Sequence, residues 1–158
     1  MVCIFEGQIG KTRYIIPGRE IPKCFEKVNV CDTSVVPYLS TYKIIKKVKI
    51  QLPECDEWRG IVLCVLFLPT ERHYRSSLGC QTSYSTYGQY RTWLNITSEY
   101  GKVESHHLWL HSVSKSNFRL PKTPGCSIDK KGFHQDQVEL EIVTGRFLEV
   151  EKIGFRVI

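Results

Sequence analysis

Histidines give the strongest local sign of metal chemistry in this 158-residue sequence. They gather in segment 106–111, where His107 and His111 would share one face if the segment were a helix. They alternate instead with apolar residues such as Leu108 and Leu110, which is typical of a strand. Positions four apart on a strand lie about 13 Å apart, too far for two imidazoles that must each reach about 2.0–2.1 Å from one zinc ion. We therefore expect no metal site.

Seven cysteines could form a disulfide framework or a metal site, but their spacing favours neither. The count is odd and no Cys-x-x-Cys pair occurs, whereas zinc sites normally contain two close ligand pairs. Cys64 lies inside the most apolar stretch, residues 61–68, where a free thiol packs as a small hydrophobic side chain. The pattern favours mostly reduced cysteines in an intracellular protein.

Motifs for nucleophilic or phosphate chemistry are absent from the sequence. It contains neither a Gly-x-Ser-x-Gly nucleophile elbow nor a glycine-rich phosphate loop. The carboxylates of Glu54, Asp56 and Glu57 stand within one turn and are typical of solvated loop charge. We expect no enzymatic activity, no catalytic residue and no cofactor.

The chain carries 22 Lys and Arg against 16 Asp and Glu, a net charge of +6 that mildly favours acidic partners. No recognisable nucleic-acid-binding module accompanies this charge, so we do not expect nucleic acid as a partner. The longest apolar stretch has eight residues, against about 20 for a membrane span, and the first residues lack the pattern of a secretory signal. We expect one soluble domain over residues 1–158 that does not bind membranes.

Strand periodicity dominates the sequence. Residues 43–52 alternate apolar even positions with polar odd ones, apart from Ile45 and Lys46, which predicts one buried and one solvated face. Residues 61–68 predict a central strand covered on both faces. Further strands are predicted at 13–16, 90–97, 107–111, 137–142 and 148–157, the last with a bulge near Lys152. No stretch of twelve or more residues keeps a helical period. We predict an all-β fold, an antiparallel β-sandwich of jelly-roll or Ig-like type with seven or more short strands and long loops.

Two segments, residues 26–41 and 69–89, lack clear periodicity, and we expect both to be irregular. A loop of about twenty residues in a compact domain is often functional, and tyrosine and arginine often anchor protein interfaces. The candidate ligand contacts are therefore Tyr38 in the first segment and Arg72, His73, Tyr74, Arg75, Tyr84 and Tyr87 in the second. Loop aromatics can equally pack onto their own scaffold, and that alternative stays open.

Five blocks of sequence, in order, resemble one family. They are YIIPGREIPKCF at 14–25, VKIQLP at 48–53, WRGIVLCVLF at 58–67, HLWL at 107–110 and VEKIGFR at 150–156. The first resembles the Pro-Gly-x-Glu-Ile-Pro-x-Trp-Phe motif of the post-LRR domain of plant TIR-NB-LRR immune receptors, also called C-JID for C-terminal jelly-roll and Ig-like domain. The sequence differs at Cys24, where the family usually has Trp, and at Ile153, where it often has Cys. Residues 26–41 and 69–105 match poorly.

The resemblance implies a larger receptor with TIR, nucleotide-binding and leucine-rich repeat domains before this segment, and residues 1–12 as a linker from the repeats. In the family this domain sits against the end of the repeats and helps bind a pathogen effector directly. The implied partners are thus an effector protein and the receptor's own repeats. The NAD-cleaving activity belongs to the TIR domain, and the implied location is cytoplasmic or nuclear.

The resemblance also implies a role for the first block, which we call the opening motif. Its family-matched residues are expected to be structural, with the repeats as a surface that they could face. They are Pro17, Gly18, Glu20, Ile21, Pro22 and Phe25.

Two alternatives to effector recognition remain open at the level of sequence. A repeat solenoid needs a cap over its last hydrophobic layer, so the domain could be a structural cap that contributes to autoinhibition or receptor stability without touching a ligand. A lectin-like sandwich could instead stack Trp93 and Trp109 on a sugar. Deleting a cap should destabilise the receptor for every effector, and a glycan array would reveal a lectin.

Overall fold

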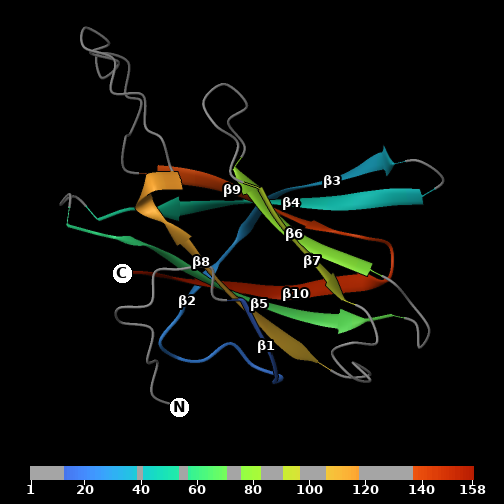
Figure 1. The fold of residues 1–158 in the computed structure, drawn as a ribbon, viewed down its shortest axis with the longest axis horizontal. Coiled ribbons are helices and arrows are strands. Elements are labelled where there is room, and N and C mark those ends of the chain that lie inside the picture. The colour runs from blue at the N-terminus through green and yellow to red at the C-terminus, as the bar shows by residue number, and fades with distance from the viewer. Residues whose placement is uncertain are drawn as a thin grey trace, which may run out of the picture.

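Two five-stranded antiparallel sheets pack face to face in the computed structural model (Figure 1). The structure describes residues 13–38, 41–53, 57–70, 76–82, 91–96, 106–117 and 137–158. The first sheet contains, in spatial order, β1 (Arg13–Pro17), β8 (His107–Ser114), β5 (Gly60–Pro69), β10 (Leu148–Val157) and β2 (Glu26–Val28). The second contains β3 (Val30–Tyr38), β4 (Thr41–Gln51), β9 (Gln137–Thr144), β6 (Ser76–Thr82) and β7 (Arg91–Ile96). The predicted all-β sandwich is confirmed.

Strand pairing follows the pattern of a long hairpin rolled into two layers. The innermost pair is β6 with β7, and around it nest β5 with β8, then β4 with β9, then β2 with β10. Successive pairs fall in alternate sheets. This arrangement of eight strands is the jelly roll. Strands β1 and β3 add to it at the sheet edges, beside β8 and β4.

A short 3-10 helix, η2 (Lys115–Asn117), follows β8. No helix in the described part of the chain is long and apolar enough to cross a membrane.

The main core fills the space between the sheets. On β4 the even positions Val48 and Ile50 are fully buried, as the alternation predicts. They meet Leu63 and Val65 of β5 and Trp109 of β8 in one hydrophobic cluster. Each large side chain buried in this way contributes roughly 1.5–3 kcal/mol relative to an exposed one, so this cluster is the main source of stability.

The outer face of β4 carries the lysines, as predicted, and their charges are matched across the sheet. Lys47 lies opposite Asp32 on β3 and opposite Glu141 on β9, and Lys49 lies opposite Glu139. Opposite charges directly across an antiparallel ladder contribute roughly 0.2–1 kcal/mol per pair. The lysine run is therefore part of a charge-matched sheet face.

Strand β5 is buried on both faces, which confirms the prediction for residues 61–68. Its second face, with Val62, Cys64 and Leu66, forms a separate cluster on the outside of the first sheet. Leu108 of β8 and Phe25 of the opening motif belong to this cluster. The segment after β1 thus folds over the outside of the sheet and covers it.

The bulge predicted near Lys152 is confirmed. The pairing of β10 with β5 shifts register between Val150 and Lys152. Because of this shift, both Val150 and Ile153 are buried in the main core although their positions differ by three.

The prediction that residues 26–41 and 69–89 are irregular is wrong for most of the positions that the structure describes there. Strands β2 and β3 occupy much of the first segment, and β6 lies within the second. Most side chains of β3 are exposed on both faces, so the strand has no apolar alternation to reveal it. Its conformation depends on pairing with β4 from Val30 to Tyr38, a contact that local periodicity does not record.

Replacing Gly154 with alanine should destabilise the fold by about 1–3 kcal/mol, because an added methyl group overpacks the contact with the opening motif. A Cβ there would lie 2.7 Å from Ile21 Cγ2 and 3.0 Å from Phe25 Cβ. At Gly18, the matched control, a Cβ would meet only one side chain, with Leu108 Cδ1 at 2.8 Å, whereas at Gly154 it would meet two side chains and a backbone carbonyl. Urea denaturation should show a larger loss for Gly154→Ala than for Gly18→Ala, and equal losses would contradict this account.

Candidate recognition surface

The opening motif packs against the sandwich with its apolar side. Phe25 is buried and Ile21 half-buried against the outer face of the first sheet, and Gly18 lies directly on Leu108. The Gly18 N–H donates to the carbonyl of His106 at 3.2 Å, and the Phe25 N–H donates to Pro22 at 3.0 Å. The motif therefore has a structural role within the domain.

The motif's charged residues lie on its other side. Arg19, Glu20 and Lys23 are exposed, and so is Pro17. Pro22 is half-buried. The exposed set is the part of the motif that a neighbouring domain could contact.

Only Tyr38 of the seven candidate ligand contacts falls within the described residues. It ends β3, where it pairs with Thr41 at the closed end of the β3–β4 hairpin. Arg72, His73, Tyr74, Arg75, Tyr84 and Tyr87 lie outside the described residues.

The two ends of β6 lie at opposite ends of the second sheet. Thr144 pairs with Ile44 on one side and with Leu78 on the other, so the start of β6 lies toward the closed end of the β3–β4 hairpin. Thr82, at the end of β6, lies across from Leu140, toward the opposite end of the sheet. β6 therefore begins at the same end of the sheet as Tyr38 and finishes at the other end. In the sequence, residues 72–75 precede β6, and Tyr84 and Tyr87 follow it.

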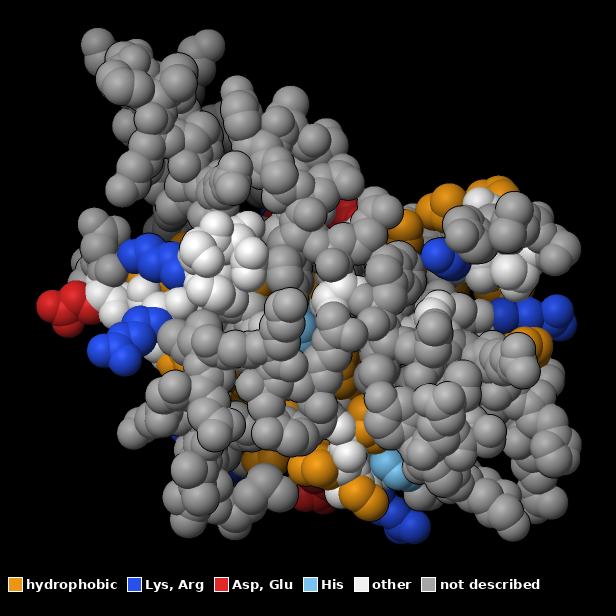
Figure 2. Space-filling view, in the orientation of Figure 1, with side chains coloured by type: hydrophobic (Ala, Val, Ile, Leu, Met, Phe, Trp, Pro, Cys, Tyr) orange, Lys and Arg blue, Asp and Glu red, His pale blue; other side chains and the backbone are white. Residues whose placement is uncertain are grey.

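Exposed hydrophobic side chains gather on the β3–β4 hairpin. Every large hydrophobic residue that is exposed in the described part of the chain lies there: Val30, Val35, Val36 and Tyr42, with Val35 the most open at 63%. We call these four residues the hairpin surface. The hairpin projects beyond the first sheet (Figure 1), and hydrophobic atoms are visible at that extremity (Figure 2). Sequence reasoning named only Tyr38 here, although the run of β-branched residues in β3 was a usable sign of a strand.

A cavity of about 280 Å³ lies at the start of β3 and carries excess positive charge. Its lining includes Lys27, Lys46 and Lys152 against one carboxylate, that of Glu151. We call it the lysine pocket. Glu151 Oε1 lies 2.9 Å from His106 Nε2, so this carboxylate already has a partner.

Lys46 is the exception to the alternation of β4, and the bulge in β10 explains it. Its side chain is half-buried on the core side of the strand, and its Nζ donates to the Val150 carbonyl at 2.8 Å. A lysine at this position thus satisfies a backbone oxygen next to the register shift.

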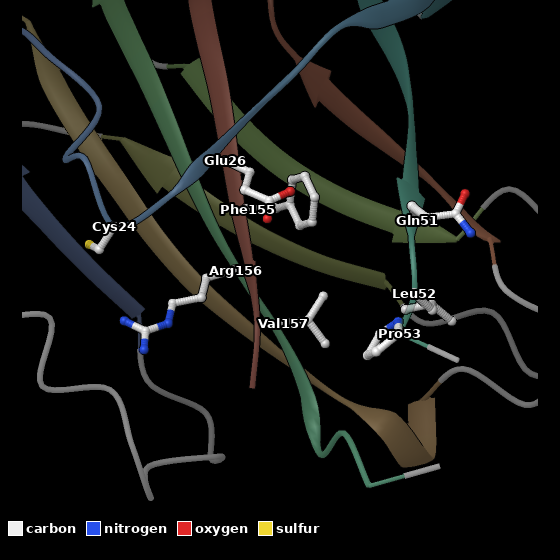
Figure 3. A pocket seen from close by; sticks show the side chains of 8 residues that line it. All are labelled: Cys24, Glu26, Gln51, Leu52, Pro53, Phe155, Arg156 and Val157. Carbon is white, nitrogen blue, oxygen red and sulfur yellow. The ribbon is translucent and has the colours of Figure 1, made fainter. Parts of the chain in front are cut away.

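A larger cavity of about 690 Å³ opens between the sheets near the end of β10 (Figure 3). Leu52, Phe155 and Val157 give it an apolar lining, and Glu26 stands beside Phe155. Arg156 extends away from the cavity toward Cys24 (Figure 3). The eight lining residues include no histidine and no free thiol, so the cavity lacks a nucleophile beside a base.

The prediction of mostly reduced cysteines needs one correction. Cys31, Cys64 and Cys80 are free, but Cys24 is disulfide-bonded. Its position in the opening motif, half-buried against the outside of the first sheet, makes a covalent tether there structurally useful. The spacing of the cysteines gave no sign of this bond, because the sequence contains no Cys-x-x-Cys pair.

The histidine segment is a strand, as predicted. His111 is buried and stacks on Trp109 with ring centroids 5.1 Å apart. Trp109 is fully buried in the main core, so its ring is not accessible to a sugar. The lectin-like alternative is therefore wrong for this residue. Within the part of the chain that the structure describes, no three potential ligands are close enough to hold a metal ion.

Comparison with known proteins assigns no family. No family model and no curated protein matches this chain.

Replacing Lys46 with methionine should lower the free energy of unfolding by about 1 kcal/mol, because the Val150 carbonyl loses its donor. Lys49→Met is the matched control, since Lys49 is exposed on the other face of the same strand. Chemical denaturation should show a change within about 0.5 kcal/mol for the control. Equal effects of the two substitutions would mean that the Lys46 contact does not stabilise the bulge.

The three free cysteines among the described residues should differ sharply in reactivity. Cys31 is exposed and should alkylate at once at pH 8. Burial raises the pKa of the Cys64 and Cys80 thiols to about 12, so both should stay thiols and react only after unfolding. Peptide mass spectrometry after a short iodoacetamide pulse measures this order, and early labelling of Cys64 would contradict the two-faced burial of β5.

Proposed function

We propose that this chain is a protein-recognition module that acts as the post-LRR domain of an intracellular plant immune receptor, contributing with the leucine-rich repeats to binding of a pathogen effector. The hairpin surface carries the proposal. Exposed hydrophobic side chains that gather in one part of a surface mark a site for a partner, and the large exposed hydrophobic residues of the described chain all lie on this hairpin.

The arrangement of the family-like blocks supports this assignment. The blocks at 14–25, 58–67, 107–110 and 150–156 fall on neighbouring strands or on the cover of a single sheet, the first one. The fifth, at 48–53, ends the strand that packs its side chains against that sheet. Blocks that are far apart in sequence thus meet as one packed unit, which is what a shared fold would require of them.

The remaining described surfaces are poorly suited to hydrophobic recognition. The outside of the first sheet is covered by the opening motif. The outer face of β4 and β9 carries alternating lysine and glutamate in register. Recognition through the hairpin therefore fits the structure better than recognition through either sheet face.

The structural cap remains the second candidate. A cap must cover the last hydrophobic layer of a solenoid, and this needs an apolar surface as wide as a repeat. The large exposed hydrophobic residues of the described chain are confined to one hairpin, which favours a local contact with a ligand over a cap. The exposed charges of the opening motif suit a polar contact with the repeats in either case.

In the receptor that carries this chain, Val35→Asp combined with Tyr42→Ser should abolish effector-dependent cell death in leaf tissue. Both side chains are exposed, so the fold and the receptor level should not change. Lys49→Glu, on the outer face of the same hairpin, is the control and should respond normally. Alanine at Arg72, Tyr74 and Tyr87 tests the candidates outside the described residues, and we expect it to reduce the response as well.

Two results would contradict the proposal. A normal response from the hairpin variant would remove the hairpin surface as the contact. If the hairpin variant instead lowers the amount of receptor on an immunoblot and loses the response to every effector, the cap is the correct function.

A further inference from the structure

Beyond the recognition role, on which this inference rests, we propose that β3 binds its partner by strand addition: an extended, acidic segment of the partner protein pairs with the free edge of β3 and enlarges the second sheet.

The edge is available because β3 has a described neighbour on one side alone. It pairs with β4 and ends the spatial order of its sheet. At nine residues it is longer than the described edge strands β1, β2 and β7, which have five, three and six. A long strand with unpaired backbone groups is a template for another strand.

Pro37 indicates which backbone groups of β3 point away from β4, toward the free edge. Proline has no N–H, so within a sheet it occupies positions whose N–H would face away from the neighbouring strand. Positions alternate in an antiparallel ladder between those bonded to the neighbour and those facing away. Thr33 and Val35 therefore direct both their N–H and C=O groups toward the free edge, whereas Ser34 and Val36 bond to β4.

Little in β3 discourages a new strand. Proteins protect their edges with charges, prolines, bulges and short strands. Here the one charged residue is Asp32, and the bulge between Val30 and Asp32 and the proline at 37 lie toward the two ends. Between them, Val35 and Val36 are exposed on opposite faces, so an added strand would gain apolar contacts above and below the sheet.

The lysine pocket defines the charge of the partner. Val30, an exposed edge residue, also lines this pocket, so the two features are continuous. Lys27 and Lys152 are exposed there, and the pocket's carboxylate is held by His106. A strand that follows the edge to this end would meet a net positive charge, because three lysines line the pocket against one carboxylate, and this favours carboxylates in the partner.

Net charge argues against a second copy of this chain as the occupant. Each chain carries +6, so two copies repel, whereas an acidic partner is attracted. The occupant is thus a segment of another protein, with apolar residues at alternate positions and acidic residues at one end.

The test uses the chain with a fluorescein-labelled peptide, Asp-Glu-Val-Thr-Val-Thr-Val, and a second peptide in which Lys-Lys replaces Asp-Glu. Fluorescence anisotropy should show that the acidic peptide binds at least about ten-fold more tightly at low salt, with a difference that shrinks as salt rises.

Val35→Pro removes the outward N–H without touching the bonds between β3 and β4, and should weaken peptide binding about ten-fold. Val35→Thr keeps that N–H and should stay within about three-fold of the parent chain. Lys27→Glu with Lys152→Glu should remove the preference for the acidic peptide, while Lys49→Glu on the outer face should keep it.

Amide hydrogen exchange gives a readout that side-chain contacts alone would not move. Thr33 and Val35 amides should exchange fast in the chain alone and slow with the peptide, whereas Ser34 and Val36 should be protected throughout. Equal binding by the Val35→Pro and Val35→Thr variants, no binding of the acidic peptide, or slow exchange of Thr33 and Val35 in the chain alone would each overturn strand addition.

Light scattering tests the other possible occupant of the edge, a second copy of this chain. A concentration-dependent dimer that Val35→Pro abolishes would assign the edge to a second copy and overturn the proposal. The peptide assays and the receptor assay with Val35→Asp and Tyr42→Ser are independent. If the peptide assays fail but the receptor variant still loses its response, strand addition is wrong and the recognition role stands.

Discussion

Burial of β5 on both faces is the constraint on which the rest of the structure depends. One face joins the main core through Leu63 and Val65, and the other holds Val62 and Cys64 against the opening motif. A strand with two apolar faces must be covered by two layers, so the second sheet is needed on one side and the opening motif on the other. Gly154 allows that motif to approach the neighbouring strand closely. The motif is thus the third layer of the sandwich.

The jelly-roll order explains why the free edge lies where it does. Nested pairing from β6–β7 outward to β2–β10 uses eight strands, and β3 remains outside these pairs. The chain crosses from the first sheet to the second between β2 and β3, beside the lysine pocket. The same crossing therefore places an unpaired edge next to positive charge, with no additional element needed to bring them together.

Sequence alone predicted the strands that bury one or both faces, because burial produces a period that can be read locally. Three such patterns reflect contact with the core: the alternation around Val48, the continuous apolar run at 61–68 and the change of parity near Lys152. Strand β3 was missed because its side chains are exposed on both faces and its conformation comes from pairing. Likewise, the sequence could not show that β3 and β6 end at opposite ends of the second sheet, since that depends on the register of β4 and β6 with β9.

The hairpin surface is therefore the part of the fold that the core constrains least. Substitutions at Val35 or Val36 leave the two hydrophobic clusters untouched, because neither residue belongs to them. A side chain that the core does not require can vary with the partner, whereas the backbone of β3 stays fixed by its ladder with β4. In the proposed strand addition, main-chain pairing would supply affinity that does not depend on the partner's sequence, and the exposed side chains and nearby lysines would select among partners. Substitutions at this edge can therefore change what it contacts without disturbing the two hydrophobic clusters of the three-layer scaffold.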